Sequence, residues 1–231
     1  MSNSVYVINP NSLVAVTDTI SRAVKSAIGD CPLPFRFVTL ADAPPGIMTQ
    51  RDADIAAPLV ANFIDGIDDA AGFIVACYSD PGVFAAREIT SVPVLGIGDA
   101  GLVAALRLGK RPGVIAVSGA GIDRHWRYYR TLGIAQTIAG ERSIDLTVAE
   151  SANRNRAMGR LIEVGGMLRD LDGADVVVLG CAGMTEMRDA LEKELGVPVV
   201  DPCTAAAVSI IQAIRSTEQA PAADAATKEA K

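Results

Sequence analysis

Short apolar runs alternate with longer segments of helical periodicity along most of the chain. The runs are rich in valine and isoleucine and are bounded by glycine, proline or polar residues, which is typical of strands buried in a parallel sheet. We predict strands near 4–9, 35–39, 72–77, 93–97, 113–117, 144–148, 174–180 and 197–200. Helices are predicted near 13–29, 52–66, 82–90, 99–109, 122–133, 152–171, 184–195 and 203–216. The pattern indicates an α/β fold with eight strands in two sets of four.

The two sets of strands repeat the same motifs. "VYVINPNS" opens the first set and "VIAVSGAG" opens the second, and each strand ends in small or polar residues that can cap a helix. Later in each set an apolar run ends in a cysteine, Cys77 in "GFIVACYSDPG" and Cys181 in "DVVVLGCAGM". A valine-proline pair follows each cysteine by 15 or 16 residues. A duplicated α/β half is the simplest explanation, with a pseudo-twofold axis between the halves.

The recurring cysteine is the strongest candidate for chemistry. Free cysteine is often buried simply as core, but the duplication favours a functional role for Cys77 and Cys181. The carboxyl end of a buried parallel strand is where open α/β sheets bind their ligands. Two sulfurs are therefore expected to face one substrate. Cys31, in a proline-rich turn, and Cys203, at the start of the last helix, have no counterparts and are interpreted as structural.

The loops after the first strand of each set are candidates for binding an oxygen. Asn9–Ser12 and Ser118–Gly121 supply amide and hydroxyl donors at predicted helix starts. Helix capping alone would explain one such loop. A matched pair beside matched cysteines is better explained as two clamps for an anion or a carbonyl.

Composition narrows the class of partner. Half of the 231 residues are apolar and the net charge is −6, with no dominant basic segment, which argues against nucleic acid and anionic membrane surfaces. No apolar stretch approaches the roughly 20 residues of a membrane span, so we expect a cytoplasmic protein with a small-molecule substrate. The four cysteines, without a C-x-x-C pair and with a single histidine, are expected to be reduced thiols that bind no metal.

Two further motifs have less specific interpretations. "GIGDAG" (Gly96–Gly101) matches the dinucleotide pattern G-x-G-x-x-G, but Asp99 would place a negative charge in the phosphate loop and the next strand ends without an acidic residue. We therefore reject a dinucleotide site. "RHWRYYR" (Arg124–Arg130) is interpreted as a solvated or oligomer-contacting helix, and a homo-oligomer is expected. His125 is too isolated to be assigned a catalytic role.

The motifs together resemble a known group of enzymes. "INPNS", "ACYSDPG" and "LGCAGM" followed by "GVPVVDP" are similar to the aspartate/glutamate/hydantoin racemase superfamily, over about residues 1–216. The "NPN" opening with "GCAGM" looks closest to its hydantoin and allantoin racemase branch. The resemblance implies two pseudo-symmetric flavodoxin-like domains with the active site in the cleft between them. The first would comprise 1–97 and a returning helix at 203–216, the second 98–202, and 217–231 would be a disordered tail.

The resemblance also implies cofactor-independent proton transfer with Cys77 and Cys181 as opposing acid and base. Inverting a carbon requires one group to remove a proton and another to deliver one to the opposite face. A cysteine held by helix N-terminal dipoles can be a thiolate near neutrality while its partner stays protonated. The carbanion would be held by the loops after the first strands and by the residues after each cysteine, namely Asn11, Ser12, Ser118, Gly119, Tyr78, Ser79, Ala182, Gly183 and Met184.

Several alternatives stay open at the level of sequence. Decarboxylation in the manner of arylmalonate decarboxylase needs one protonating cysteine, and maleate-type cis–trans isomerisation would use one sulfur as a nucleophile. A small-molecule binding protein with inert cysteines is a third possibility. The chain also has Val16-Thr17 where many relatives carry Met-Thr, so one wall of the pocket is expected to differ.

Overall fold

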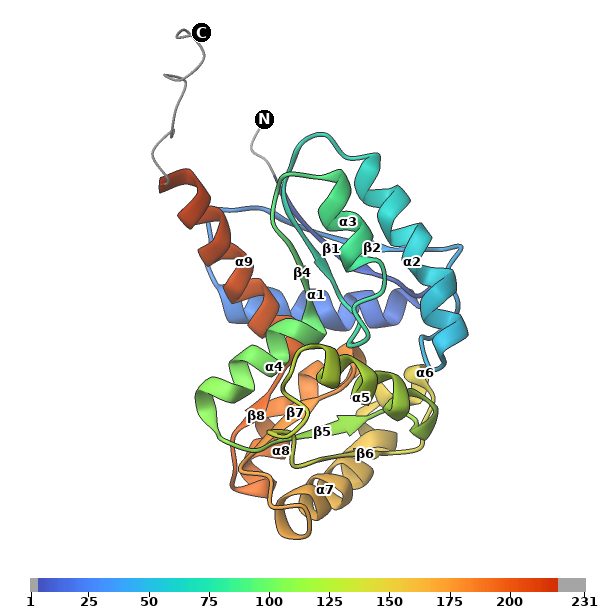
Figure 1. Ribbon diagram of the computed structural model, residues 1–231, viewed down its shortest axis with the longest axis vertical. Helices are drawn as coiled ribbons and strands as arrows, with labels where there is room; N and C mark the ends of the chain where they lie inside the picture. The colour runs from blue at the N-terminus through green and yellow to red at the C-terminus, as the bar shows by residue number, and fades with distance from the viewer. Residues whose placement is uncertain (1–3, 220–231) are drawn as a thin grey trace, which may run out of the picture.

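Two parallel sheets of four strands form the framework of the protein (Figure 1), whose computed structural model describes residues 4–219. The first sheet contains β1 (Ser4–Asn9), β2 (Phe35–Thr39), β3 (Ala70–Val75) and β4 (Val94–Gly96). The second contains β5 (Pro112–Ala116), β6 (Gly140–Ser143), β7 (Val176–Leu179) and β8 (Val199–Val200). Their orders, β2-β1-β3-β4 and β6-β5-β7-β8, are equivalent. The predicted α/β fold with two sets of four strands is confirmed.

Helices cover both faces of the first sheet, because its central strands are apolar on both faces. Three helices connect its strands and one returns from the end of the chain: α1 (Val14–Ile28), α2 (Gln50–Asp65), α3 (Val83–Ile89) and α9 (Pro202–Gln219). Val7 and Ile74 pack with the α1 and α9 side of the sheet. Tyr6, Ile8 and Phe73 point the other way and pack with α2 and α3. Alternate residues of each strand thus serve separate cores.

The second sheet is covered in the same way. Its helices are α4 (Ile97–Leu108), α5 (Ile122–Thr131), α6 (Val148–Ser151), α7 (Arg154–Asp170) and α8 (Arg188–Leu195), with 3-10 turns η1 (Gly119–Gly121) and η2 (Ala182–Met187). Leu161 and Leu191, from α7 and α8, pack on one face, whereas Leu102 and Tyr129, from α4 and α5, pack on the other. Each sheet with its helices forms one lobe. The carboxyl ends of the central strands of both sheets lead into loops between the two lobes (Figure 1).

Two helices link the lobes. α4 follows β4 of the first sheet and packs on β7 of the second, whereas α9 follows β8 and packs back on α1, β3 and β4. α4 and α9 also pack on each other. The proposed domain limits at 97/98 and 202/203 stay a prediction. The last helix continues to Gln219, past the predicted start of the tail at 217, and 220–231 lie outside the described residues.

The predicted strand at 144–148 is wrong in position. The structure has β6 four residues earlier, in the polar segment "GERS", and α6 begins at Val148. β6 is an edge strand that pairs with β5 alone, so the sequence there needs no continuous apolar run. Ile144 and Val148 are buried as parts of the following loop and helix, which explains why their apolar pattern resembled a strand.

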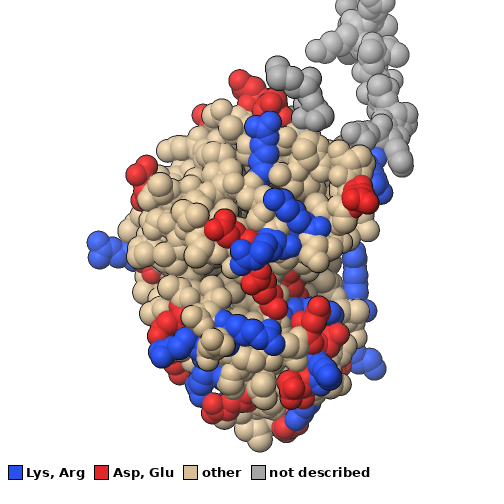
Figure 2. All heavy atoms as spheres, turned by 180° about the vertical axis from the view of Figure 1, so that it is seen from behind, with Lys and Arg blue, Asp and Glu red and all other residues tan. Residues whose placement is uncertain are grey.

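The surface carries charges of both signs. On the face turned away in Figure 1, basic and acidic side chains are interspersed (Figure 2). Within residues 4–219 no helix combines the length and apolar character needed to cross a bilayer. The exposed apolar side chains include Val103 and Leu108 of α4 and Val208 of α9. The expected homo-oligomer stays a prediction.

Candidate active site

The two repeated cysteines line one cavity between the lobes. Cys77 lies two residues after β3 and Cys181 two residues after β7, so each occupies the carboxyl end of a central strand. The cavity measures about 40 Å³ and is also lined by the loops after β1 and β5. It therefore combines equivalent elements of both halves, as strand ends in open α/β sheets do when they form a binding site.

Burial dominates the chemistry of Cys77. The loss of solvent around the thiol raises its pKa to about 12, because the charged form is poorly solvated there. The backbone N–H of Ser79 and the guanidinium of Arg124 act in the opposite direction, and the charges of Cys181 and Asp80 add to the rise. The effect of Cys181 on Cys77 follows from their sharing one small cavity.

Cys181 has a different environment. Burial raises the pKa of this thiol too, but hydrogen bonds to Gly183 and Ser151 oppose the rise. The backbone N–H of Gly183 lies 3.4 Å from the Sγ atom, and the buried Ser151 hydroxyl lies 3.6 Å from it. Desolvation outweighs the backbone N–H groups at both sites, so the pKa of each thiol is raised, whereas helix N-termini alone would lower it.

The asparagine loop after β1 is fixed by its own side chains. The Nδ2 of buried Asn9 donates to Asn11 Oδ1, at 3.1 Å, and to Thr17 Oγ1, at 3.0 Å. Asn11 Oδ1 also accepts from the Leu13 N–H. The side-chain oxygen of Asn11 is thereby used within the loop. The side-chain Nδ2 of Asn11 is the donor that can face the cavity, which Asn11 lines.

The structure brings together seven of the eleven site residues expected from sequence. The cavity is lined by Cys77, Cys181, Asn11, Tyr78, Ser79, Ser118 and Ala182, and also by Val16 of the wall expected to differ. Ser12, Gly119, Gly183 and Met184 do not line it. Ser12 is bound through its N–H to Pro44, Gly119 is exposed, and Met184 is completely buried in the core. Gly183 contributes only its N–H to Cys181.

Asp80 explains the glycines of "GIGDAG". Its buried carboxylate accepts hydrogen bonds from the N–H groups of Gly98 and Asp99, both at 2.9 Å, at the start of α4. A Cβ at Gly96 would overlap this carboxylate. A side chain of the protein thus occupies the place where a dinucleotide would put its phosphate, in agreement with the rejection of a dinucleotide site. Burial raises the pKa of Asp80 well above its usual range.

α5 carries a buried polar network that was not predicted from the sequence. His125 is only 7% exposed, and its Nδ1 pairs with Glu141 of β6 at 2.5 Å. Its Nε2 lies 3.2 Å from Ser79 Oγ, which also accepts from Arg124 Nη2 at 2.8 Å. The interpretation of "RHWRYYR" as merely a solvated helix is wrong for this face. The i, i+4 spacing of His125 and Tyr129 was the available signal.

Comparisons with known proteins agree with this geometry. The family model for Asp/Glu/hydantoin racemase matches residues 5–210. A hydantoin racemase from Pseudomonas sp. (strain NS671) is 34% identical, covering 85% of this chain and 80% of that protein. The structure of an allantoin racemase from Klebsiella pneumoniae superimposes with a TM-score of 0.87 at 28% identity, covering 94% of this chain and 89% of the other.

A more distant comparison marks what the fold alone decides. The crystal structure of arylmalonate decarboxylase superimposes with a TM-score of 0.63 at 20% identity, covering 91% of this chain and 92% of that one, so the architecture is shared across different reactions. The family match and the racemase relatives go further. The chain therefore belongs to the Asp/Glu/hydantoin racemase family and is an isomerase of the racemase type.

Proposed function

We propose that the protein inverts a hydantoin- or allantoin-like carbon acid by proton transfer between Cys77 and Cys181. The observation that carries the proposal is the arrival of two thiols, from equivalent strands of the two halves, in one small cavity. A two-base inversion needs an acid and a base on opposite sides of one carbon. Decarboxylation would need one protonating thiol, so the pair favours inversion.

The proton balance requires one thiolate and one thiol. The thiolate takes the proton from the C–H bond, and the electron pair of that bond remains on the substrate as an enolate. The opposite thiol then delivers its proton to the other face of the carbon and becomes the thiolate. The protein ends with the two roles exchanged. Both proton transfers use side chains of the chain itself.

The raised pKa values of the thiols suit this chemistry. A thiolate whose pKa is raised by burial is a stronger base than an exposed one, and it can remove a weakly acidic proton. As a consequence, only a small fraction of each cysteine is present as thiolate near neutrality. Asn11 Nδ2, the Ser118 hydroxyl and the N–H groups after each cysteine are the proposed donors to the enolate oxygen.

Proton exchange in heavy water tests the proposal. Each enantiomer of a simple hydantoin is incubated with the wild type, Cys77→Ser and Cys181→Ser, and the ring C–H is followed by NMR. Each variant is expected to lose inversion by about 10³-fold or more, while retaining exchange with one enantiomer only, and opposite enantiomers in the two variants. Wild-type rates of inversion in either variant would overturn the two-thiol mechanism. Cys203→Ser, which alters a buried thiol outside the cavity, is the matched control.

A further inference from the structure

The guanidinium of Arg124 is partly buried and has unused hydrogen-bond donors. Its Nη2 donates to Ser79 Oγ, at 2.8 Å. Its Nε and Nη1 are both buried and have no hydrogen-bond partner among the described residues. Burying an unpaired charge is costly unless an anion and further hydrogen bonds compensate for it. Arg124 is therefore expected to meet an anion when the protein functions.

The acidic groups around Arg124 are already engaged elsewhere. Glu141 accepts from His125 and Tyr129. Asp52 accepts from the N–H groups of Met48 and Thr49 in the cap of α2. Both carboxylates influence the charge of Arg124 only through space. Cys77, when ionised, is the strongest negative charge acting on Arg124 through space. The donors Nε and Nη1 have no hydrogen-bond partner among the described residues and stay available to an anion of the substrate.

Arg124 lies where two cavities meet. The cysteine cavity of about 40 Å³ has room for only a few water-sized groups, so a substituent on a small ring must extend beyond it. The adjoining cavity, of about 340 Å³, shares Tyr78, Ser79, Arg124 and His125 with the first. A substituent leaving the cysteines in this direction passes the guanidinium.

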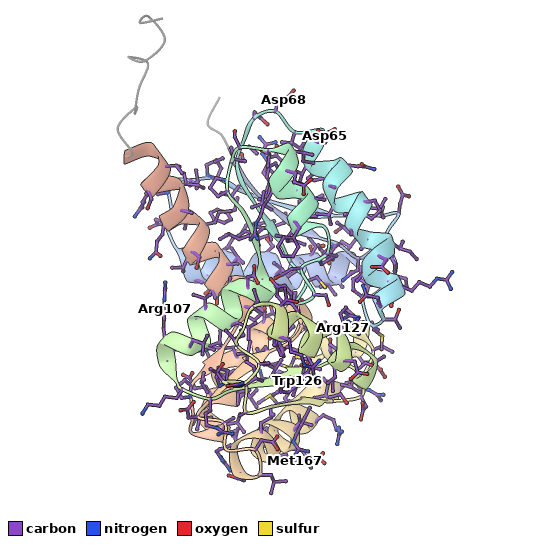
Figure 3. The ribbon with its side chains drawn as sticks, viewed as in Figure 1. Asp65, Asp68, Arg107, Trp126, Arg127 and Met167 are labelled. Atoms are coloured by element: carbon purple, nitrogen blue, oxygen red, sulfur yellow. The ribbon has the colours of Figure 1, made fainter. Side chains whose placement is uncertain are left out.

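The second cavity has both apolar and polar lining residues, and Ala53, Ala57 and Leu102 are among the apolar ones. Its lining includes Gln50 from α2 and Arg127 and Tyr128 from α5. Arg127 lies on α5 beside the start of α2 (Figure 3), and its Nη2 donates to Gln50 Oε1 at 2.9 Å. A charged or polar substituent that lies along this polar side of the cavity would keep these groups solvated or hydrogen-bonded.

We propose that the substrate bears an anionic substituent, a carboxylate on the side chain of the carbon acid, which Arg124 binds while the reacting carbon lies between the cysteines. This inference rests on the proposed function and names the substrate class. A charge-assisted hydrogen bond between a guanidinium and a carboxylate is stronger than one to a neutral amide. The protein should therefore prefer the hydantoin of glutamate to the hydantoin of glutamine, which has the same shape without the charge.

The experiment measures both compounds on the same proteins. Exchange of the ring C–H in heavy water gives kcat/KM, and calorimetry gives the dissociation constants. The wild type, Arg124→Gln and Arg124→Lys are compared with Arg130→Gln, which removes a positive charge from an exposed position of the same helix. Thermal unfolding checks that each variant is folded, and the lysine variant keeps the charge if the glutamine variant does not fold.

The expected result is a wild-type preference for the acid of about 100-fold, as for a buried charge pair. Arg124→Gln should remove the preference, Arg124→Lys should retain part of it, and Arg130→Gln should retain it fully. Equal use of both compounds by the wild type, or an equal loss for both in Arg124→Gln, would overturn the inference and leave the proposed function standing. If the wild type exchanges neither compound, the proposed function fails. Tighter binding of the acid that depends on Arg124 then supports the inference, and equal binding overturns it.

Discussion

The two cysteine loops have the same place in the fold and are held in different ways. After β3, the loop of Cys77 is tied to the second lobe by the polar network of Ser79, His125 and Glu141. After β7, the loop of Cys181 is anchored by Met184 in the core and by a hydrogen bond of 2.6 Å between Thr185 Oγ1 and Asp201. The Cys77 loop is thus held by a buried polar network, and the Cys181 loop by packing together with one buried hydrogen bond.

Both loops nevertheless perform the same structural task. Asp80 reaches from the first loop to cap α4, and Thr185 reaches from the second to Asp201, whose carboxylate caps α9 at the N–H of Cys203, at 3.0 Å. Each cysteine loop is therefore joined to the helix that crosses to the other lobe. A duplicated fold preserves this linkage while its two halves acquire different electrostatics.

The difference separates the two thiols chemically. Cys77 carries a pKa of about 12, raised by burial and by neighbouring negative charge. At Cys181 two hydrogen bonds oppose the effect of burial. We expect Cys181 to ionise first in the free protein, with Cys77 depending on the positive charge of Arg124.

The largest expected effect on stability comes from breaking the buried polar network beside the Cys77 loop. His125→Leu removes the imidazole that pairs with the fully buried Glu141 side chain, which should lower the free energy of unfolding by about 3–5 kcal/mol. Urea denaturation measures it. The control, Arg22→Ala, breaks the exposed Arg22–Glu186 pair beside the second loop and should cost at most about 1 kcal/mol. Similar losses of unfolding free energy in the two variants would contradict the larger stabilising role of the polar network at the Cys77 loop.

A smaller effect tests the link between the first loop and α4. In Gly98→Ala the new Cβ would meet Asp80 Oδ2 at 2.9 Å and also the Tyr78 carbonyl, so the cap must shift. We expect a loss of about 1–3 kcal/mol of unfolding free energy. Gly159→Ala is the control, because nothing lies within 4 Å of its Cβ on α7, and it should be stabilising by about 0.5–1 kcal/mol. Thermal and urea unfolding measure both variants. A neutral effect of Gly98→Ala on the unfolding free energy would contradict the role of Asp80 in the cap.

The smallest effect concerns the second thiol and appears in the pH profile. Since burial raises the pKa of both cysteines, the thiolate fraction and kcat/KM should rise about tenfold per pH unit above neutrality. Ser151→Ala removes the hydroxyl whose hydrogen bond with Cys181 lowers the pKa of that thiol, so the pKa should rise and kcat/KM should fall roughly fivefold near neutrality. The deficit should disappear at high pH. A loss independent of pH would show that Ser151 acts through packing, whereas Ser216→Ala, an exposed hydroxyl on α9, should change nothing.

Much of the fold could be predicted because the spacing of apolar residues along the sequence matches the periodicity of the strands and helices. The apolar runs of β1, β3, β5 and β7 are central strands that must be apolar on both faces, and all four were located within about two residues. The edge strand β6 lacked that signal, because it pairs on one side only. The cysteine pair was readable for the same reason, since each thiol follows a strong strand signal.

The remainder of the site has no sequence signature of this kind. Arg124 and His125 lie in a helix that is charged along its length, and Glu141 lies in a polar edge strand 16 residues after His125. Apart from the i, i+4 spacing of His125 and Tyr129, nothing local indicates that these side chains turn inward. Their burial depends on how α5 packs on the second sheet and on how that sheet faces the first.

The sequence by itself determined the duplicated α/β framework, the position of one cysteine at the end of the third strand in each half, and the family. These features follow from short-range patterns, because strand burial and turn chemistry act over a few residues. The tertiary structure alone decided the pKa direction of the thiols, the charged network beside Cys77 and the unpaired guanidinium of Arg124. Desolvation and long-range pairing depend on groups brought together from distant segments, and no single segment of the chain contains that information.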